Sequence, residues 1–266
     1  MTSTERARHI RRLVLETISG AGLGHVGGDL SVTDILAVLY ADVLRLDPLR
    51  PDWPERDRII VSKGHAAVAL YSAMALEGFL EIEELQTFAR PHSRLNGHPA
   101  RTKLPGVETS TGPLGHGLPI AVGMAIGAII SGDEWRTYVV TGDGELQEGS
   151  NWEAIMLAGH RQLTNLTCVV DRNRLQQGAP TEETNGLDPL DAKFAAFGWD
   201  AVVVDGHDHQ ALREALVAPH VKPRAVIAET TKGKGVSFME NLAVWHHKVP
   251  SDEQVAAALV EVGGHS

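Results

Sequence analysis

Residues 137–173 read TYVVTGDGELQEGSNWEAIMLAGHRQLTNLTCVVDRN, and this stretch decides the fold. It opens with a short β-branched run at 137–141, which is typical of a strand. A second apolar run follows at 166–171, and the residues between the two runs, 152–161, have the pattern of a helix. A strand, a helix and a strand in this order predict two parallel strands with a helix packed across them.

The same alternation continues toward the C-terminus, and the first half of the chain is mostly helical by pattern. Because the strands are nearly continuous apolar runs, they predict a parallel sheet that is buried on both faces. The expected fold class is α/β, a doubly wound, mostly parallel sheet with helices on both faces, and residues 1–266 are expected to form a single domain. Further strands are expected at 201–205 and 225–229, and helices at 4–19 (ended by Gly20-Ala21-Gly22), 32–44, from Lys63-Gly64-His65 to about Leu76, 188–197, 208–217 and 252–262.

Local signals predict the starts of two of these helices and one further helix. Ser31 with Asp34, and Ser150 with Glu153, resemble capping boxes that would open two of the helices. The longest apolar stretch, residues 114–130, is interrupted by several glycines and a proline. It therefore falls short of a transmembrane span and predicts a buried helix.

Composition narrows the classes of function. The formal charge is −10, from 24 basic and 34 acidic residues, which argues against nucleic acid or an anionic membrane as the main partner. Residues 1–12 are polar and charged and carry no apolar segment of a signal peptide. The single cysteine, Cys168, lies in an apolar run, so no disulfide is expected within the chain and a cytoplasmic location is expected.

A metal site is indicated where the first two predicted strands end. The first strand runs into Gly142-Asp143-Gly144, where glycines let backbone N–H groups approach an anion and the next helix N-terminus adds positive potential. That tripeptide is common in turns, so the stronger evidence is Asn173, which follows the second strand. Adjacent parallel strands would bring Asp143 and Asn173 side by side. A carboxylate and an amide oxygen are hard donors suited to Mg²⁺ or Ca²⁺, and a diphosphate can complete the coordination.

The sequence segments around these residues resemble those of the transketolase family. Four segments match in order and cover essentially the whole chain: DRIIVSKGHAAVALYSAM (57–74), GVETSTGPLGHGLPIAVGMAIG (106–127), GDGELQEGSNWEA (142–154) and TKGKGVSFMENLAVWHHK (231–248). The resemblance implies the diphosphate-binding domain of the thiamin diphosphate-binding fold. It also implies thiamine diphosphate with Mg²⁺, or Ca²⁺ or another divalent cation in its place, and transfer of a two-carbon ketol unit between sugars.

The resemblance assigns roles to individual positions. Asp143, Asn173 and the backbone carbonyl of Leu175 would hold the metal, and the backbone of Gly144 would meet the diphosphate. Gly112 and Leu114 match the segment that contacts the aminopyrimidine. The remaining implied contacts to cofactor or substrate are His65, Lys232, His246 and Lys248, and His116 stands where the family carries Gln or His.

Four histidines at positions that match the family's site histidines are predicted to be catalytic: His25, His65, His98 and His246. Imidazoles with a pKa near neutral can take or give the protons of sugar hydroxyls, and as cations they can stabilise a developing alkoxide. The other histidines singled out are expected to be structural or at the surface, namely His9, His92, His207, His209, His220 and His265.

Two positions depart from the family pattern. Arg172 stands where the first of two asparagines is common, and the metal ligands are expected to survive this change. His247 stands where glycine commonly follows the histidine, so the sequence leaves open which imidazole points inward. Lys63 and Arg172 are expected at the surface or at an interface.

The family's full-length enzymes carry a pyrimidine-binding domain that supplies the glutamate of cofactor activation and much of the sugar-phosphate binding. Nothing of that size follows His246, so the pyrimidine-binding and C-terminal domains are expected on a separate chain. The resemblance therefore implies the N-terminal subunit of a split transketolase that is active only with a C-terminal subunit, as a heterotetramer of two copies of each. Sugars or sugar phosphates would be the substrates, and the sequence does not name the donor or the acceptor.

Two alternatives stay open. One is a subunit of a decarboxylating thiamine diphosphate enzyme, similar to 1-deoxyxylulose-phosphate synthase. The other is a catalytically silent binding partner. The KGKG segment at 232–235 and the WHHK segment at 245–248 favour transketolase.

Overall fold

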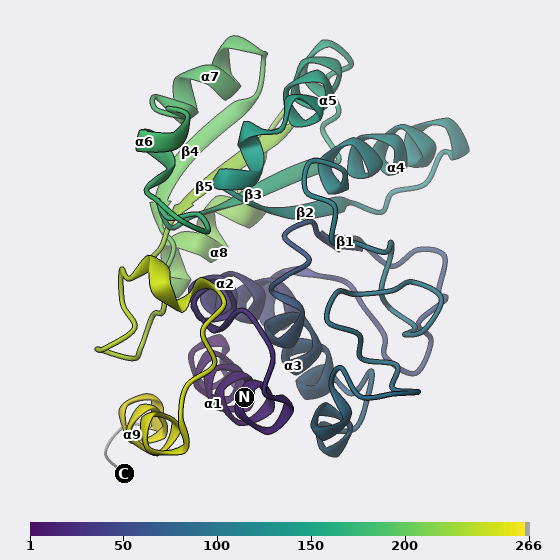
Figure 1. Ribbon diagram of the computed structural model, residues 1–266. Coiled ribbons are helices and arrows are strands. Elements are labelled where there is room, and N and C mark those ends of the chain that lie inside the picture. Colours follow the sequence, from purple (N-terminus) through teal and green to yellow (C-terminus); the bar gives the residue numbers. More distant parts are fainter. Residues whose placement is uncertain (264–266) are drawn as a thin grey trace.

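A single parallel sheet organises the molecule. The computed structural model describes residues 1–263, so His265 lies outside the described residues. In this part of the chain five strands pair in the order β1-β2-β3-β5-β4, and every pairing is parallel (Figure 1). The predicted fold class is confirmed. The strands are β1 (Arg58–Val61), β2 (Thr137–Gly142), β3 (Leu166–Arg172), β4 (Asp200–Asp205) and β5 (Arg224–Glu229).

Four of these strands were predicted within a residue of their bounds, but β1 was not predicted. β1 has only four residues, and the short apolar run Ile59-Ile60-Val61 was the available signal. Its strand character depends on pairing with β2, where Ile60 stands opposite Val139. β1 is important for the functional site, because the Lys63-Gly64-His65 segment follows shortly after its carboxyl end.

Helices cover both faces of the sheet. Figure 1 shows α4, α5 and α7 on one face and α1, α2, α3 and α8 on the other, with α9 packed against α1. The helices are α1 (Ser3–Ala21), α2 (Val26–Val38), α3 (Ala67–Glu77), α4 (Gly117–Ser131), α5 (Gly149–His160), α6 (Thr181–Thr184), α7 (Leu190–Ala196), α8 (His209–Val217) and α9 (Asp252–Gly263). Short helical segments are η1 (Leu39–Val43), η2 (Ile82–Thr87), η3 (Gly144–Gln147) and η4 (Ala243–His246).

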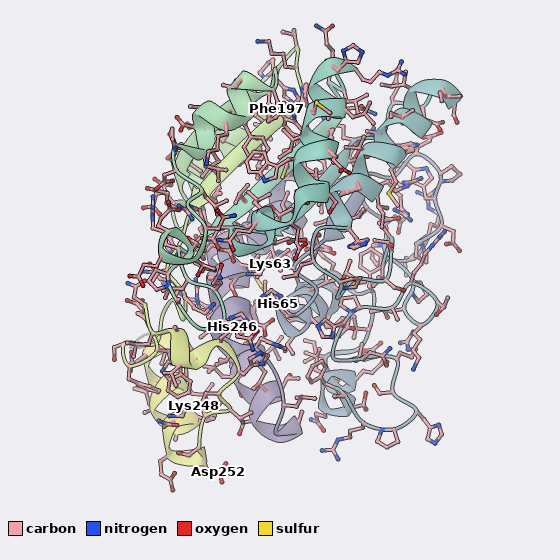
Figure 2. The ribbon with its side chains drawn as sticks, turned by 45° about the horizontal axis from the view of Figure 1, so that its top comes forward. Lys63, His65, Phe197, His246, Lys248 and Asp252 are labelled. Atoms are coloured by element: carbon pink, nitrogen blue, oxygen red, sulfur yellow. The ribbon has the colours of Figure 1, made fainter. Side chains whose placement is uncertain are left out.

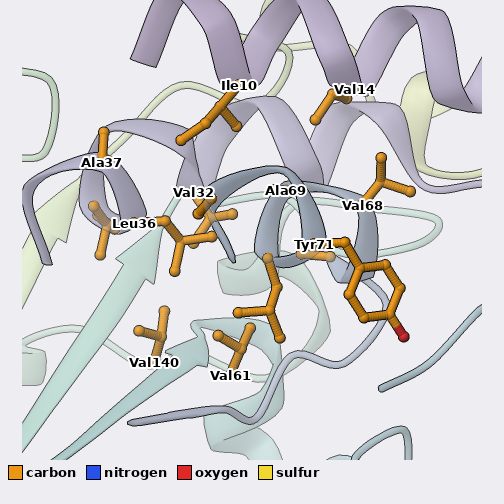
Figure 3. Close-up of a cluster of buried hydrophobic side chains, with 14 of the residues drawn as sticks. Ile10, Val14, Val32, Leu36, Ala37, Val61, Val68, Ala69, Tyr71 and Val140 are labelled. Carbon is orange, nitrogen blue, oxygen red and sulfur yellow. The ribbon is translucent and has the colours of Figure 1, made fainter. Parts of the chain in front are cut away.

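Each face of the sheet has its own apolar core. Successive side chains of a strand point to opposite faces, so neighbouring residues enter different cores. Val61 and Val140 face α1, α2 and α3, as Figure 3 shows. Ile60, Val139 and Cys168 pack in the second core, under α4 and α5. Cys168 is fully buried and unpaired, as the sequence indicated.

Both predicted capping boxes are wrong. α2 begins at Val26, six residues before the predicted start, so Ser31 lies inside the helix and donates to Asp171 at 2.6 Å. α5 begins at Gly149 without a side-chain cap, and the Ser150 hydroxyl donates to the Gly115 carbonyl at 2.7 Å. In both places a polar side chain that suits a helix start is used for a tertiary contact.

The prediction that 114–130 forms a buried helix is only half right. α4 packs one side on the sheet through residues such as Leu118 and Ala125, which are fully buried. Its outer side is open, with Ile129 54% and Ile130 80% exposed. Among the residues that the structure describes, no helix is long and apolar enough to cross a membrane.

Candidate functional site

The carboxyl ends of the strands open into one cavity of about 430 Å³. This is the edge of a parallel sheet at which α/β proteins bind ligands. The segments after β1, β2, β3 and β5 line it together with the start of α2 and the end of η4. Eleven of the positions named from the sequence line the cavity, namely His25, His65, His98, Gly112, Leu114, Asp143, Gly144, Asn173, Leu175, Lys232 and His246.

The three proposed metal ligands come from neighbouring strand ends. Gly142 pairs with Asp171 in the β2–β3 ladder, which places Asp143 beside the segment that carries Asn173. The Asp143 carboxylate accepts the N–H groups of Gly144 at 2.7 Å and Arg174 at 2.5 Å. These bonds hold the carboxylate at the floor of the cavity.

Asn173 and Leu175 form a compact turn beside that carboxylate. The Asn173 side-chain oxygen accepts the Leu175 N–H at 3.1 Å, and the Leu175 carbonyl accepts Lys232 Nζ at 3.3 Å. Burial and the nearby Asp171 raise the pKa of Asp143 above its usual value. A carboxylate that burial destabilises in its charged form gains from a bound cation, so this set of oxygen donors fits a hard divalent metal.

The absence of a side chain at Gly144 keeps the space beside Gln176 open. A Cβ built there would approach Gln176 to 3.1 Å, which is closer than ordinary packing. The buried Gln176 side-chain oxygen has no hydrogen-bond partner among the described residues. A glycine turn and an unsatisfied polar group on one wall suit a polar ligand that approaches the backbone closely.

Lys63 and Arg172 are buried inside this chain, so their predicted placement at the surface or at an interface is wrong. Each is 1% exposed and is paired with a buried carboxylate: Lys63 with Asp171, and Arg172 with Asp143 at 3.2 Å. Arg172 also contacts Glu182 at 2.6 Å, beyond β3. Burial of such charges is tolerated because each has a partner of opposite sign.

Asp171 bonds to several segments of the cavity wall, a role that was not predicted from the sequence. Burial alone would raise its pKa, but Lys63, Ser31 and Thr230 outweigh burial and hold the pKa below the usual value. These partners come from the segment after β1, from α2 and from the segment after β5, so one carboxylate joins three parts of the cavity wall. An aspartate at the end of an apolar strand was the available signal.

Glu145 is a second buried carboxylate on the cavity wall. It accepts the hydroxyl of Ser62 and the N–H groups of Gly115 at 3.1 Å and Gly142 at 3.0 Å. Burial raises its pKa. The contacts join the ends of β1 and β2 to the segment before α4.

A group of imidazoles forms the opposite wall. The ring of His25 lies 5.3 Å from that of His65, 5.6 Å from that of His246 and 6.2 Å from that of His98. Figure 2 shows Lys63, His65 and His246 gathered in the middle of the molecule. The structure therefore brings together four histidines from four separate parts of the chain.

These imidazoles are neutral at pH 7. Burial, followed by His247 and His98, lowers the pKa of His25 to about 4. Burial and Lys232 lower the pKa of His246 to about 3, and burial with Lys63 takes the pKa of His65 well below its usual value. The rings can therefore exchange hydrogen bonds and protons with a ligand as neutral imidazoles.

Lys232 connects the imidazole wall with the oxygen cluster. Its ammonium lies 3.1 Å from His246 Nδ1 and also donates to the Leu175 carbonyl. Burial, with Lys63 nearby, lowers its pKa to about 8. The lysine is therefore placed to meet an anionic group between the two walls.

His207 supports the segment that carries Lys232. Its Nε2 accepts the Thr231 N–H at 2.8 Å, and its Nδ1 lies 2.6 Å from Asp34. Asp34 also pairs with Arg11 and His209. The prediction that His207 is structural agrees with these contacts.

Two positions that matched the family do not reach the cavity. Lys248 is exposed and lies 4.6 Å over the Trp245 ring, away from the labelled site residues in Figure 2. His116 precedes α4 and is exposed, with Nδ1 3.0 Å from the Leu114 carbonyl. Gly112 does reach the cavity: its φ of 141° is one that glycine favours, and a Cβ there would approach the His98 ring to 3.3 Å.

Comparison with known proteins agrees with this geometry. Residues 2–265 match the sequence model of the family described as "Transketolase, thiamine diphosphate binding domain". The chain belongs to the transketolase family. It is 47% identical over 262 residues to one of the subunits of the apulose-4-phosphate transketolase of Actinobacillus succinogenes, covering 97% of this chain and 95% of that protein. It is 41% identical over 260 residues to the 6-deoxy-6-sulfo-D-fructose transketolase subunit SqwG of a Clostridium species, covering 97% and 94%.

Solved transketolases share the fold. The transketolase of Campylobacter jejuni superposes with a TM-score of 0.93 at 33% identity, covering 98% of this chain. This chain spans 42% of the length of that one. The family, the fold and the class of transketolase-type transferase predicted from the sequence are confirmed by these matches.

Proposed function

We propose that this chain is the cofactor-anchoring subunit of a two-chain transketolase. In this proposal it transfers a two-carbon ketol unit from a ketose, or ketose phosphate, to an aldose or aldose phosphate. The observation that carries the proposal is the single cavity in which the oxygen cluster of Asp143, Asn173 and Leu175 faces the neutral imidazoles of His25 and His246.

Thiamine diphosphate, when bound, supplies the carbanion and the electron sink that cleavage of a ketose C2–C3 bond requires. Asp143, Asn173 and the Leu175 carbonyl would hold Mg²⁺ between them and the diphosphate, because these are the oxygen donors that Mg²⁺ prefers. The backbone of Gly144 and the ammonium of Lys232 would meet the diphosphate oxygens.

The histidines would handle the protons. In this proposal His25, His65, His98 and His246 are the catalytic residues that hydrogen-bond the hydroxyls of the donor sugar. A neutral imidazole can accept a hydroxyl proton as the carbonyl forms and return it in the next step. The low pKa values of His25 and His246 keep both rings in the accepting form at neutral pH.

A partner subunit would complete the site. Two named relatives that match nearly full length are each called a subunit of a transketolase. The outer surfaces of α4 and α5 expose apolar side chains, with Ile130 80%, Met156 55% and Leu157 41% exposed. Burial of such a surface favours association. The partner is proposed to carry the pyrimidine-binding domain, with two copies of each chain in the assembly.

The test is a reconstitution. The chain is assayed for ketol transfer with thiamine diphosphate and Mg²⁺, alone and with a separately encoded pyrimidine-domain subunit. Turnover is expected only in the mixture. Donors should include ordinary ketose phosphates together with apulose 4-phosphate and 6-deoxy-6-sulfofructose, the compounds in the relatives' names.

A matched pair of variants tests the metal site. Asp143→Asn should abolish Mg²⁺-dependent cofactor binding in calorimetry, whereas Asp191→Asn, at an exposed position of α7, should not change it. Equal binding by both variants, or full activity of this chain without a partner, would refute the proposal. Release of CO₂ from pyruvate in place of ketol transfer would favour a decarboxylating enzyme, and a complex that binds no cofactor would favour a silent partner.

A further inference from the structure

Three imidazoles meet at one side of the cavity in a way that the proposed ketol transfer does not require. His25 precedes α2, while His246 and His247 stand at the end of η4. One ring nitrogen from each of the three lies within 4.8 Å of the others. The ring of His247 is 4.3 Å from that of His25 and 4.8 Å from that of His246.

We propose that His25, His246 and His247 form a binding site for a borderline transition-metal cation such as Zn²⁺, separate from the oxygen site of Asp143 and Asn173. Imidazole nitrogen is a preferred ligand of Zn²⁺, and three histidines with an open fourth position are a recurrent zinc arrangement. Mg²⁺ prefers oxygen donors, so the two sites would select different metals.

The geometry needs only side-chain movement. With Zn–N bonds of about 2.0–2.1 Å, ligand nitrogens of a tetrahedral site stand about 3.3 Å apart. Since the nitrogens now lie within 4.8 Å of one another, each pair must approach by at most about 1.5 Å. His247 is exposed, and its ring already lies beside those of His25 and His246.

The protonation states favour metal binding. Burial lowers the pKa of His25 to about 4 and that of His246 to about 3, so neither ring has to lose a proton at neutral pH before it binds a cation. The nearby ammonium of Lys232 opposes a cation. When His246 turns away from Lys232, the ammonium of Lys232 still donates to the Leu175 carbonyl. The charge of Lys63 is already neutralised by Asp171.

His247 is the residue that makes a third ligand available. Without its ring the cluster would have two imidazoles, those of His25 and His246. A cation bound by all three would lie across the cavity wall that His25 and His246 form.

The test measures metal binding and does not depend on catalytic activity. The full chain is held in saturating Mg²⁺ and titrated with Co²⁺, whose visible absorption reports tetrahedral nitrogen coordination, and then with Zn²⁺ against a chromogenic chelator. The variant is His247→Gly, and the matched control is His116→Gln, an exposed histidine outside the cluster. Far-ultraviolet circular dichroism checks that both variants are folded.

One equivalent of Zn²⁺ is expected to bind the wild-type chain and the control equally. His247→Gly should weaken binding at least about tenfold, since loss of a group that merely orients a ligand already costs about 10–100-fold. Asp143→Asn should leave Zn²⁺ binding unchanged. Equal affinity in His247→Gly, or loss of the Zn²⁺ site in Asp143→Asn, would overturn the proposal, the latter because it would place the metal at the oxygen cluster.

Discussion

Replacing Lys63 with methionine removes one half of a buried ion pair on which the cavity wall depends. The ammonium is 1% exposed and contacts Asp171, which is 0% exposed, and it also donates to the Gly28 carbonyl at 3.1 Å. Methionine keeps most of the side-chain length but not the charge. In Lys63→Met the Asp171 carboxylate keeps its contacts with Ser31 and Thr230 and loses its counter-charge.

Breaking a buried pair by removing one partner costs about 3–5 kcal/mol, because the remaining charge stays buried without compensation. We therefore expect Lys63→Met to lower the free energy of unfolding by about that amount at pH 7. The double variant Lys63→Met, Asp171→Asn removes the stranded charge and should be more stable than the single variant. Lys222→Met, at an exposed lysine, is the control and should change stability by less than about 0.5 kcal/mol.

The pH dependence follows from the pKa of Asp171. In the wild type this pKa lies below the unfolded value, so the stabilisation is present above the unfolded pKa and is lost as pH falls through the folded pKa. In Lys63→Met burial is opposed only by the hydrogen bonds from groups such as Ser31 and Thr230, so the pKa of Asp171 rises relative to wild type. The deficit relative to wild type should therefore shrink as pH falls and the carboxyl becomes protonated. Urea unfolding followed by tryptophan fluorescence at several pH values measures these quantities. A loss below about 1 kcal/mol at pH 7, or equal losses in the single and double variants, would refute the reasoning.

Three further outcomes are expected. Gly159→Ala should destabilise the fold by at least about 1–3 kcal/mol, because the new Cβ would lie 1.7 Å from the Phe197 carbonyl oxygen. Gly123→Ala has no neighbour within 4 Å in the described structure and should stabilise the fold by about 0.5–1 kcal/mol. Thermal unfolding compares the two variants, and similar melting temperatures would contradict the packing argument. His207→Ala should cost about 1–3 kcal/mol, because the Thr231 N–H loses its acceptor while Asp34 keeps its bonds to Arg11 and His209, and an unchanged urea midpoint would show that the His207 bonds contribute nothing. Burial raises the pKa of the Cys168 thiol to about 12, so a disulfide reagent should label it only at the rate of unfolding, and fast labelling of the native chain would rule out the buried placement.

The site was predictable to the extent that its residues stand next to strong local signals. Asp143 and Asn173 follow long apolar strands, and adjacent parallel strands had to bring them together. Lys63 and Arg172 were misplaced because a charged side chain gives no local sign of a buried partner. Their carboxylates come from other strands, 108 positions away in the chain for the Lys63 pair and 29 for the Arg172 pair.

Local sequence patterns were enough to predict the parallel α/β class, four of the five described strands and the residues at the strand ends. Those features depend on short-range periodicity and on turn residues, which act within a few positions along the chain. Only the tertiary structure decided the strand order, the use of Ser31 and Ser150 as tertiary donors, and the open outer side of α4. The same holds for the meeting of His25 with His246 and His247, because that contact joins segments more than 200 residues apart and depends on how the helices pack on the sheet.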